Sequence, residues 1–290
     1  MQSERRTATL VGSTAILMWS LLAVLTAASG RVPPFLLTAL AFAIGGGAGT
    51  AVLAARGAWR DLRQPLAAWG LGVGGLFGFP FFYFPAPRAA PPVEASLIAY
   101  LWPLLIVVLS AFLPGERLRW FHVAGALLGL AGTALVVTGG TGFAIDPVYL
   151  PGYASALACA VVWAVYSVLS RRFAAVPTGA VAGFCLATAA LSAGAHLLFE
   201  ETVWPATGGE WLAVLGLGLM PVGAAFYAWD HGVKRGDIQV LGAGAYAAPL
   251  LSTAILVMTG FAPARWSIAA AALLITAGAA LAAKDVFRRR

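Results

Sequence analysis

The stretch from Glu94 to Arg119, EASLIAYLWPLLIVVLSAFLPGERLR, is a membrane-length apolar run that a proline interrupts. Pro103 lies near its middle, and Tyr100 and Trp102 come just before it. A proline inside a helix removes one backbone hydrogen bond and clashes with the preceding turn, so the segment is expected to kink or break. In hydrocarbon, such a break is tolerated where neighbouring helices or a cavity bind the freed backbone groups. The stretch therefore predicts a broken transmembrane helix beside a pocket.

The same pattern recurs 146 residues later, where Tyr246-Ala-Ala-Pro249 repeats Tyr100-Leu-Trp-Pro103. If each half of the chain holds five spans, an odd number, the second half must enter the membrane in the opposite sense. This is the inverted repeat of a secondary transporter, whose substrate site lies near the midplane where the repeats meet. Other matches occur at almost the same offset: Trp19 with Trp163, Pro33 with Pro177, and Phe81 and Tyr83 with Tyr227 and Trp229.

The composition is that of an integral membrane protein. The chain is 61% hydrophobic and only 10% charged, with a mean hydropathy of +0.88. A soluble domain would carry about a quarter charged residues. The formal net charge of +7 is therefore assigned to membrane topology rather than to a nucleic-acid partner. Cys159 and Cys185 fall in apolar segments, which predicts two free buried thiols.

Apolar runs of membrane length predict an all-α integral membrane protein with ten transmembrane helices, arranged as two inverted five-helix repeats. Residues 1–140 form the first repeat and residues 141–290 the second, and together they are expected to make one transport unit. The connections are too short for a soluble domain. The predicted spans are 8–29, 34–55, 66–84, 92–113, 121–139, 152–170, 179–199, 211–229, 239–259 and 267–283.

The distribution of basic residues predicts the orientation, because Lys and Arg concentrate on the cytoplasmic side of a membrane protein. With the N-terminus inside, 15 of the 18 Lys and Arg residues face the cytoplasm. Both termini are then cytoplasmic, as an even number of spans requires, and a bacterial-type inner membrane is expected. The outside set is Arg31, Arg88 and Arg265, and the inside set is Arg5, Arg6, Arg56, Arg60, Arg63, Arg117, Arg119, Arg171, Arg172, Lys234, Arg235, Lys284, Arg288, Arg289 and Arg290.

Central Pro103 followed by Gly115-Glu116-Arg117 resembles the fourth helix and its exit in the drug/metabolite transporter superfamily, in its ten-span EamA-type branch. Trp19-Ser20 and Pro249 also fit, and the resemblance covers essentially the whole chain and extends to the aromatic amino-acid exporters of that branch. It implies export of aromatic or other hydrophobic amino acids and related metabolites by alternating access. One departure is Ala262, which stands at the repeat position of Glu116.

Aromatic side chains provide most of the candidate substrate site. Aromatic faces suit a planar apolar ligand and attract an ammonium group through cation–π interaction. In the run 77–84, helical spacing places Phe79, Phe82 and Tyr83 on one face, and we favour the Phe79/Tyr83 face for the pocket. Packing against lipid or other helices is the alternative for each ring.

Tyr100 and Tyr246 lie within the membrane, three residues before their prolines, where a buried hydroxyl needs a partner. Either the backbone groups freed beside the prolines supply that partner, or the hydroxyls hold the polar groups of a substrate. The candidate substrate-binding residues are Trp19, Phe79, Tyr83, Tyr100, Trp102, Pro103, Trp163, Tyr227, Tyr246 and Pro249.

Ionisable residues are expected only near the ends of the spans, with Asp230 at the inner end of the eighth. Glu94 and His196 are the candidates for proton coupling, although each also fits an interfacial position. Facilitated or potential-sensitive transport and proton antiport both stay open. Glu116 is expected to pair with Arg117 or Arg119 at the surface.

Two other function classes are alternatives. A drug or lipid translocase of the same fold is compatible with the aromatic run. A membrane enzyme acting on lipid-linked substrates has less support, because the chain contains no HExxH, GxSxG, paired-carboxylate or metal-ligand pattern. No catalytic residue, metal ion, cofactor or nucleic acid is expected. The expected partners are membrane lipid and a small-molecule substrate, an aromatic amino acid, and a duplicated chain is able to work as a monomer.

Overall fold

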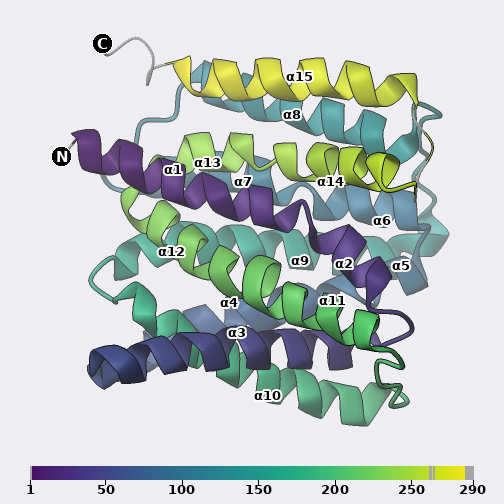
Figure 1. Cartoon of the computed structure of the whole chain (residues 1–290). Coiled ribbons are helices and arrows are strands. Elements are labelled where there is room, and N and C mark those ends of the chain that lie inside the picture. Colours follow the sequence, from purple (N-terminus) through teal and green to yellow (C-terminus); the bar gives the residue numbers. More distant parts are fainter. Residues whose placement is uncertain (1, 261–262, 264, 285–290) are drawn as a thin grey trace.

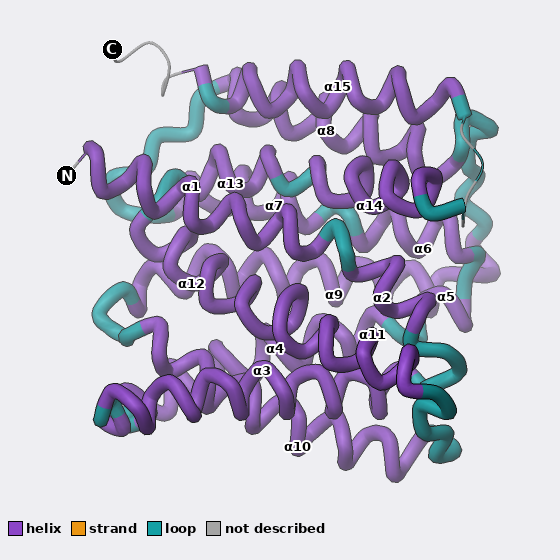
Figure 2. The backbone as a smooth tube through the Cα atoms, in the orientation of Figure 1, coloured by secondary structure: helices purple, strands orange, loops and turns teal. Residues whose placement is uncertain are grey.

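The computed structural model describes residues 2–260, 263 and 265–284, and in these residues all regular structure is helical (Figures 1 and 2). Within the described residues, nine helical segments are long and apolar enough to cross a membrane, and Trp266–Ala282 is a shorter apolar helix. The described residues thus confirm the ten predicted spans. Each of their ends lies within a few residues of its predicted position, with four exceptions. The first span starts at Ser3, the sixth starts with a 3₁₀ turn at Pro147, the third ends at Ala89 and the eighth ends at Arg235.

Five spans are single α-helices and the others consist of two helical pieces. The single helices are α3 (Pro34–Arg56), α8 (Trp120–Thr138), α9 (Leu150–Leu169), α10 (Val181–Phe199) and α15 (Trp266–Ala282). The divided spans are α1–α2 (Gln2–Trp19 and Leu22–Ala28), α4–α5 (Leu66–Tyr83 and Ala86–Ala89), α6–α7 (Pro92–Ala99 and Trp102–Leu109), α11–α12 (Gly208–Leu219 and Ala225–Arg235) and α13–α14 (Ile238–Gly244 and Ala247–Met258).

The divisions in the fourth and ninth spans follow from their prolines. Pro103 and Pro249 each fall in the first turn of the second piece, α7 and α14, where the missing N–H would have no helical partner anyway. The eighth span is interrupted by a π-helical turn, Met220–Ala224, that contains Pro221. The break predicted around Pro103 is confirmed. The break in the first span, after Trp19, lies beside no proline.

The two halves of the chain interlock rather than forming separate lobes. The most extensive contacts join α8 with α15, α3 with α10, α1 with α12, and α4 with α9, and each of these pairs takes one helix from either half. Figure 1 shows α15 lying along α8 at one side of the bundle and α3 along α10 at the other. When each span is replaced by its counterpart in the other half, the same four pairs result. This is expected if a pseudo-twofold axis relates the two halves. The main apolar core therefore forms between the halves.

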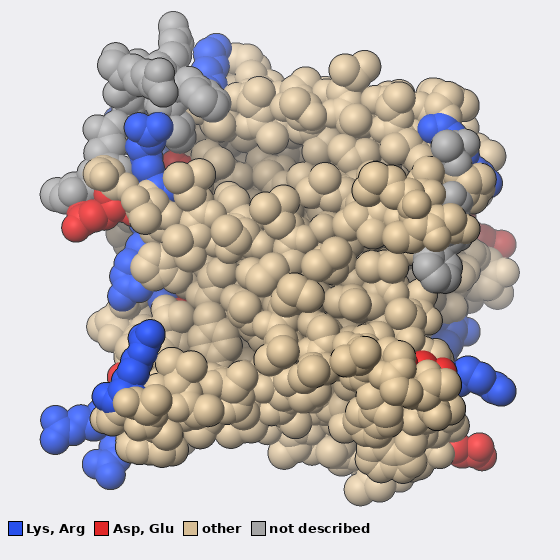
Figure 3. All heavy atoms as spheres, viewed as in Figure 1, with Lys and Arg blue, Asp and Glu red and all other residues tan. Residues whose placement is uncertain are grey.

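The direction of the helices shows that the two halves are inverted. Arg5, at the start of the first span, forms an ion pair with Glu116, which in turn pairs with Arg171 at the end of the sixth span. The first and sixth spans therefore run in opposite directions. We call the end of the bundle that holds these residues the basic end, and Lys and Arg side chains gather along it in Figure 3. Ala262 and Arg288–Arg290 lie outside the described residues.

A glycine pair allows one of the close approaches between the halves. Gly12 on α1 faces Gly232 on α12, and a Cβ atom built on Gly232 would lie 2.5 Å from the Cα atom of Gly12. No side chain fits at that distance without moving a helix backbone. Small residues of this kind are what lets transmembrane helices pack in contact, because van der Waals packing rather than the hydrophobic effect holds them together in lipid.

Gly232→Leu is expected to separate α1 from α12 and lower the free energy of unfolding by about 1–3 kcal/mol, the usual cost of overpacking. Gly47→Leu is the matched control, because Gly47 lies on the exposed side of α3, where an added Cβ atom would have no neighbour within 4 Å. Thermal unfolding of the purified protein in detergent measures both. Equal stability of the two variants would contradict the packing described here.

Candidate functional site

Four tryptophans from four different spans meet in the middle of the bundle. Trp19 is the last residue of α1, Trp102 is the first of α7, Trp163 lies on α9, and Trp229 lies on α12. All six pairs of rings are in contact, with centroids 5.0–6.4 Å apart. Most pairs are edge-to-face or tilted, which matches the quadrupole of aromatic rings. We call these residues the tryptophan cluster, and two of its members adjoin helix breaks.

The aromatic surface continues from the tryptophan cluster toward the end opposite the basic end. Phe79 lies edge-on to Trp163 at 5.7 Å and stacks on Tyr83, also at 5.7 Å. Tyr83 in turn lies near Tyr100 of the fourth span. Both tyrosines are half-buried. The Phe79/Tyr83 face of α4 therefore borders the cluster, whereas Phe81 on its other face is exposed.

The indole nitrogens of two cluster members are anchored by hydrogen bonds. Trp19 donates through Nε1 to the carbonyl oxygen of Pro221, 3.0 Å away, within the π-helical turn. Trp229 donates to the hydroxyl of Ser167, also 3.0 Å away. π-Helical turns like the one at Pro221 free backbone groups from the regular helical hydrogen bonds and are frequent at functional sites. Trp229 is fully buried. It is not among the candidate residues predicted from the sequence, although its repeat counterpart Tyr83 is.

Tyr246 has different surroundings from its repeat counterpart Tyr100. It is fully buried, its ring packs against Gly129 of α8, and its hydroxyl accepts a hydrogen bond of 3.2 Å from the backbone N–H of Leu104. That N–H lies in the first turn of α7, where a helix offers no backbone acceptor. Tyr246 thus binds the broken fourth span of the other half, and it belongs to the small core beside α8 and α15 rather than to the tryptophan cluster.

The remaining candidates lie around this centre without forming one continuous lining. Pro103 and Pro249 are buried in the first turns of α7 and α14. Tyr227 is half-buried, and its hydroxyl donates to the carbonyl oxygen of Gly45 on α3 at 3.3 Å. The structure brings together Trp19, Trp102, Trp163 and Phe79, with Tyr83 and Tyr100 adjoining them. It places Tyr227 and Tyr246 at the contacts with α3 and α8.

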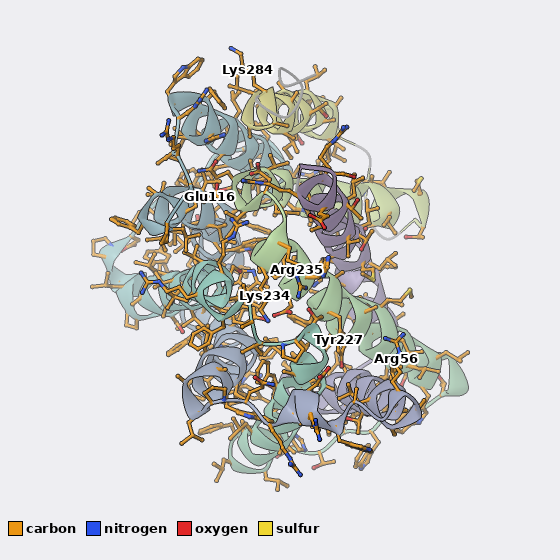
Figure 4. The ribbon with its side chains drawn as sticks, turned by 90° about the vertical axis from the view of Figure 1, so that its left-hand side faces the viewer. Arg56, Glu116, Tyr227, Lys234, Arg235 and Lys284 are labelled. Atoms are coloured by element: carbon orange, nitrogen blue, oxygen red, sulfur yellow. The ribbon has the colours of Figure 1, made fainter. Side chains whose placement is uncertain are left out.

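A network of charged side chains joins the two halves at the basic end, where Figure 4 labels one of its members, Glu116. Glu116 is bound by Arg5 at 3.0 Å and by Arg171 at 2.6 Å, and Arg5 also reaches Asp237 at 3.1 Å. Arg171 donates to the backbone carbonyl of Gly236 as well. The expectation that Glu116 pairs with Arg117 or Arg119 is wrong. Its side chain turns inward to partners from other spans, because three helix ends converge at this point.

The structure also corrects the expectation that charge stays at the ends of the spans. The eighth span ends at Arg235 rather than at residue 229, so that Asp230 lies more than a turn inside it. Asp230 is 2% exposed and forms a 2.7 Å ion pair with Lys234, which is 6% exposed.

Glu94 and His196, the candidates for proton coupling, lie at the end opposite the basic end. His196 contacts Glu200 at 3.0 Å and Thr202 at 2.8 Å. Glu200 accepts hydrogen bonds from the first backbone N–H groups of α3, so this pair links α10 to the start of α3. Glu94 accepts a bond of 3.4 Å from the N–H of Ala144, and its other oxygen is buried without a partner among the described residues. Their role in coupling stays a prediction.

Comparison with known proteins places this geometry among transporters. The sequence profile of the EamA-like transporter family matches residues 6–138 and again residues 150–283. The chain is 62% identical over 283 residues to the aromatic amino acid exporter YddG of Ancylobacter novellus, covering 96% of this chain and 98% of the relative. It is 26% identical over 202 residues to the exporter of that name in Escherichia coli K12, covering 65% of this chain and 66% of the relative.

Another relative is a probable terminal-alkyne amino-acid exporter of Streptantibioticus cattleyicolor, 27% identical over 69% of this chain and 67% of the relative. Among solved structures, a protein crystal structure with 62% sequence identity matches with a TM-score of 0.91, covering 96% of this chain and 98% of the other. The fold and the family matches therefore extend over nearly the whole chain.

Tyr246→Phe is expected to lower the free energy of unfolding by about 1–3 kcal/mol, because it leaves the buried N–H of Leu104 without an acceptor. Tyr149→Phe is the control, since Tyr149 is 38% exposed and its hydroxyl makes no hydrogen bond within the described residues. Thermal or denaturant unfolding in detergent compares the two. Indistinguishable stabilities would mean that Tyr246 does not support the broken helix.

Glu116→Gln is expected to loosen the basic end, since Arg5 and Arg171 lose the carboxylate that they share. Amide hydrogen exchange in residues 3–12 and 114–119 should become faster, by about tenfold if the opening costs about 1.4 kcal/mol less. Arg117→Gln changes an exposed residue of the same turn and should leave exchange unchanged. Equal protection in both variants would show that the network does not hold the helix ends together.

Proposed function

The chain belongs to the EamA-like transporter family, and from this premise we propose that it exports aromatic amino acids across a bacterial inner membrane by alternating access. Membership of the family makes it a multi-pass membrane transporter. The choice of substrate is supported by its likeness to an exporter named for aromatic amino acids, which is 62% identical over nearly the full length of both chains.

The observation that carries this proposal is the tryptophan cluster. Its four rings come from the first, fourth, sixth and eighth spans, two from each half, and they meet where the halves pack together. In transporters built from inverted repeats, the substrate binds at the repeat interface near the bilayer midplane, beside interrupted helices. An aromatic ring of a substrate would stack among rings of the same kind, and its ammonium group would gain from their electron-rich faces.

We assign the basic end to the cytoplasm, following the distribution of Lys and Arg. Both termini are then cytoplasmic, and the ionic network that joins Arg5, Glu116 and Arg171 would act as the gate on that side. Opening of the network would admit the substrate to the tryptophan cluster, and closing it while the other end separates would release the substrate outside. Because the single chain holds both halves of the site, we expect the monomer to transport.

Purified protein in liposomes is expected to move labelled phenylalanine and tryptophan at least about tenfold faster than labelled threonine, since only the first two can stack in the cluster. The flux is measured with and without an imposed pH gradient. Flux without a gradient indicates facilitated export. Flux only with a gradient indicates proton coupling, which makes Glu94 and His196 the next positions to mutate. No flux of any amino acid would overturn the proposal and favour a drug or lipid translocase.

Trp163→Leu serves as the site variant in the same assay, because Trp163 contacts all three other members of the cluster. The matched control is Trp204→Leu, since Trp204 is exposed and stacks on Trp211 outside the core. A loss of aromatic flux in the first variant alone supports the site. Equal flux in both variants would remove the tryptophan cluster from the transport path.

A further inference from the structure

The connection between the second and third spans carries three arginines close together in sequence. Arg56 is the last residue of α3, Arg60 lies in the 3₁₀ helix η1 (Trp59–Leu62), and Arg63 follows directly after it. All three are exposed, and none of their side chains forms an ion pair or hydrogen bond within the described residues. Arg56 lies toward the rim of the basic end in Figure 4, and Figure 3 shows Lys and Arg side chains projecting beyond the end of α3. We call these residues the arginine triad.

The other basic side chains of this end are bonded or lie apart from one another. Arg5 and Arg171 are held by Glu116, and Lys234 and Arg235 each bond to a side chain of their own helix, α12. Among the described residues, no other segment of the basic end places three exposed, unpaired arginines so near each other. The arginine triad is therefore a local concentration of positive charge that the protein itself does not neutralise.

The backbone of this connection is held without help from the arginine side chains. Gly57 has a φ of +63°, which ends α3, and its N–H and that of Ala58 bond back to carbonyl oxygens of α3. Gln64 donates through Nε2 to the carbonyl oxygen of Asp61 at 3.0 Å. The carboxylate of Asp61 lies against Gly179 at the start of the seventh span, where a Cβ atom would clash with it. The conformation of the segment thus leaves the arginines free to bind an outside partner.

Apolar side chains beside the arginine triad indicate what kind of partner fits. Trp59 is 50% exposed and Leu66, the first residue of α4, is 88% exposed. Because α3 and α4 both belong to membrane spans, the connection between them lies at the level of the lipid headgroups. Tryptophan is enriched at that level, where its ring contacts both apolar and polar groups. A soluble anion would pair with the arginines alone, whereas a phospholipid supplies a phosphate together with an acyl chain.

We propose that the arginine triad is a binding site for the headgroup of an anionic phospholipid in the cytoplasmic leaflet. The guanidinium groups of Arg56, Arg60 and Arg63 bind the phosphate oxygens, since the planar fork of arginine matches phosphate in a bidentate manner. Trp59 lies beside the upper part of the acyl chain. A headgroup with net negative charge is preferred over a zwitterionic one, because it also relieves the mutual repulsion of three neighbouring cations.

The position of η1 connects the bound lipid to the helix pair that joins the two halves. Helix η1 contacts η5 (Thr178–Ala180), the 3₁₀ turn that begins the seventh span, and α3 packs along α10 of that span. A headgroup that binds the arginine triad therefore holds the end of α3 beside the start of α10. Anionic lipid is expected to stabilise the folded protein, whatever substrate the protein carries, so this inference goes beyond the proposed function.

Thermal unfolding of the full-length protein in detergent, titrated with phosphatidylglycerol or with phosphatidylcholine, tests the site. Wild type should need at least about tenfold less phosphatidylglycerol than phosphatidylcholine for half of the maximal stabilisation. Arg56→Gln/Arg60→Gln/Arg63→Gln should raise the half-stabilising concentration of phosphatidylglycerol at least about tenfold. The corresponding triple lysine variant keeps the charge and should restore it to within about threefold of wild type. Arg60→Gln alone, with an expected loss of about fivefold, decides the test if the triple glutamine variant does not fold.

A matched control separates a local site from the general charge of the basic end. Arg6→Gln/Arg117→Gln/Arg172→Gln removes the same charge from three exposed arginines that lie in three different segments, and its half-stabilising concentration should stay within about twofold of wild type. Equal losses in the two triple glutamine variants would overturn the proposal. It would also be overturned if phosphatidylcholine or inorganic phosphate stabilised wild type as well as phosphatidylglycerol does, or if phosphatidylglycerol had no effect.

Discussion

The need to bond every backbone polar group inside hydrocarbon is the constraint on which this structure depends. Five spans of the described chain are broken or distorted, and each break frees groups that lipid cannot bind. Two of these groups are bonded by side chains from the opposite half: Tyr246 accepts from the N–H of Leu104, and the carbonyl of Pro221 accepts from Trp19. The breaks therefore tie the halves together at the level where the tryptophan cluster forms. A segment that would be a defect in an isolated helix becomes a point of contact between repeats.

This arrangement gives the bundle a graded interior. At its centre the side chains are aromatic. The indole N–H of Trp19 donates to the carbonyl oxygen of Pro221, and that of Trp229 donates to the hydroxyl of Ser167. Toward the basic end the buried Asp230–Lys234 pair follows, and beyond it the shared carboxylate of Glu116 holds helix ends from both halves. Charge thus increases toward the surface, as the cost of burying it falls.

Much of the architecture was predictable because lipid imposes simple rules on sequence. Apolar length defined the ten spans, and Pro103 and Pro249 predicted two of the breaks from the missing N–H alone. Internal repetition indicated Trp19 and Trp163, and helical spacing separated the Phe79/Tyr83 face from the rest of the aromatic run. The break after Trp19 was not predictable in this way, since nothing in the local sequence forbids a continuous helix there. Nor did spacing reveal that Tyr246 faces α8 while its counterpart Tyr100 adjoins Tyr83.

The sequence by itself determined that this protein crosses the membrane ten times, that its halves are inverted repeats, and that aromatic residues gather near the interrupted helices, because hydropathy, proline and repetition act along the chain. Only the tertiary structure decided which side chains meet. The partners of Glu116 lie 111 and 55 residues away along the chain, and Trp229 joins three other tryptophans from three other spans. The burial of Asp230 with Lys234 was decided in the same way, because whether a charge near a helix end faces water or a neighbouring helix depends on packing that local sequence does not encode.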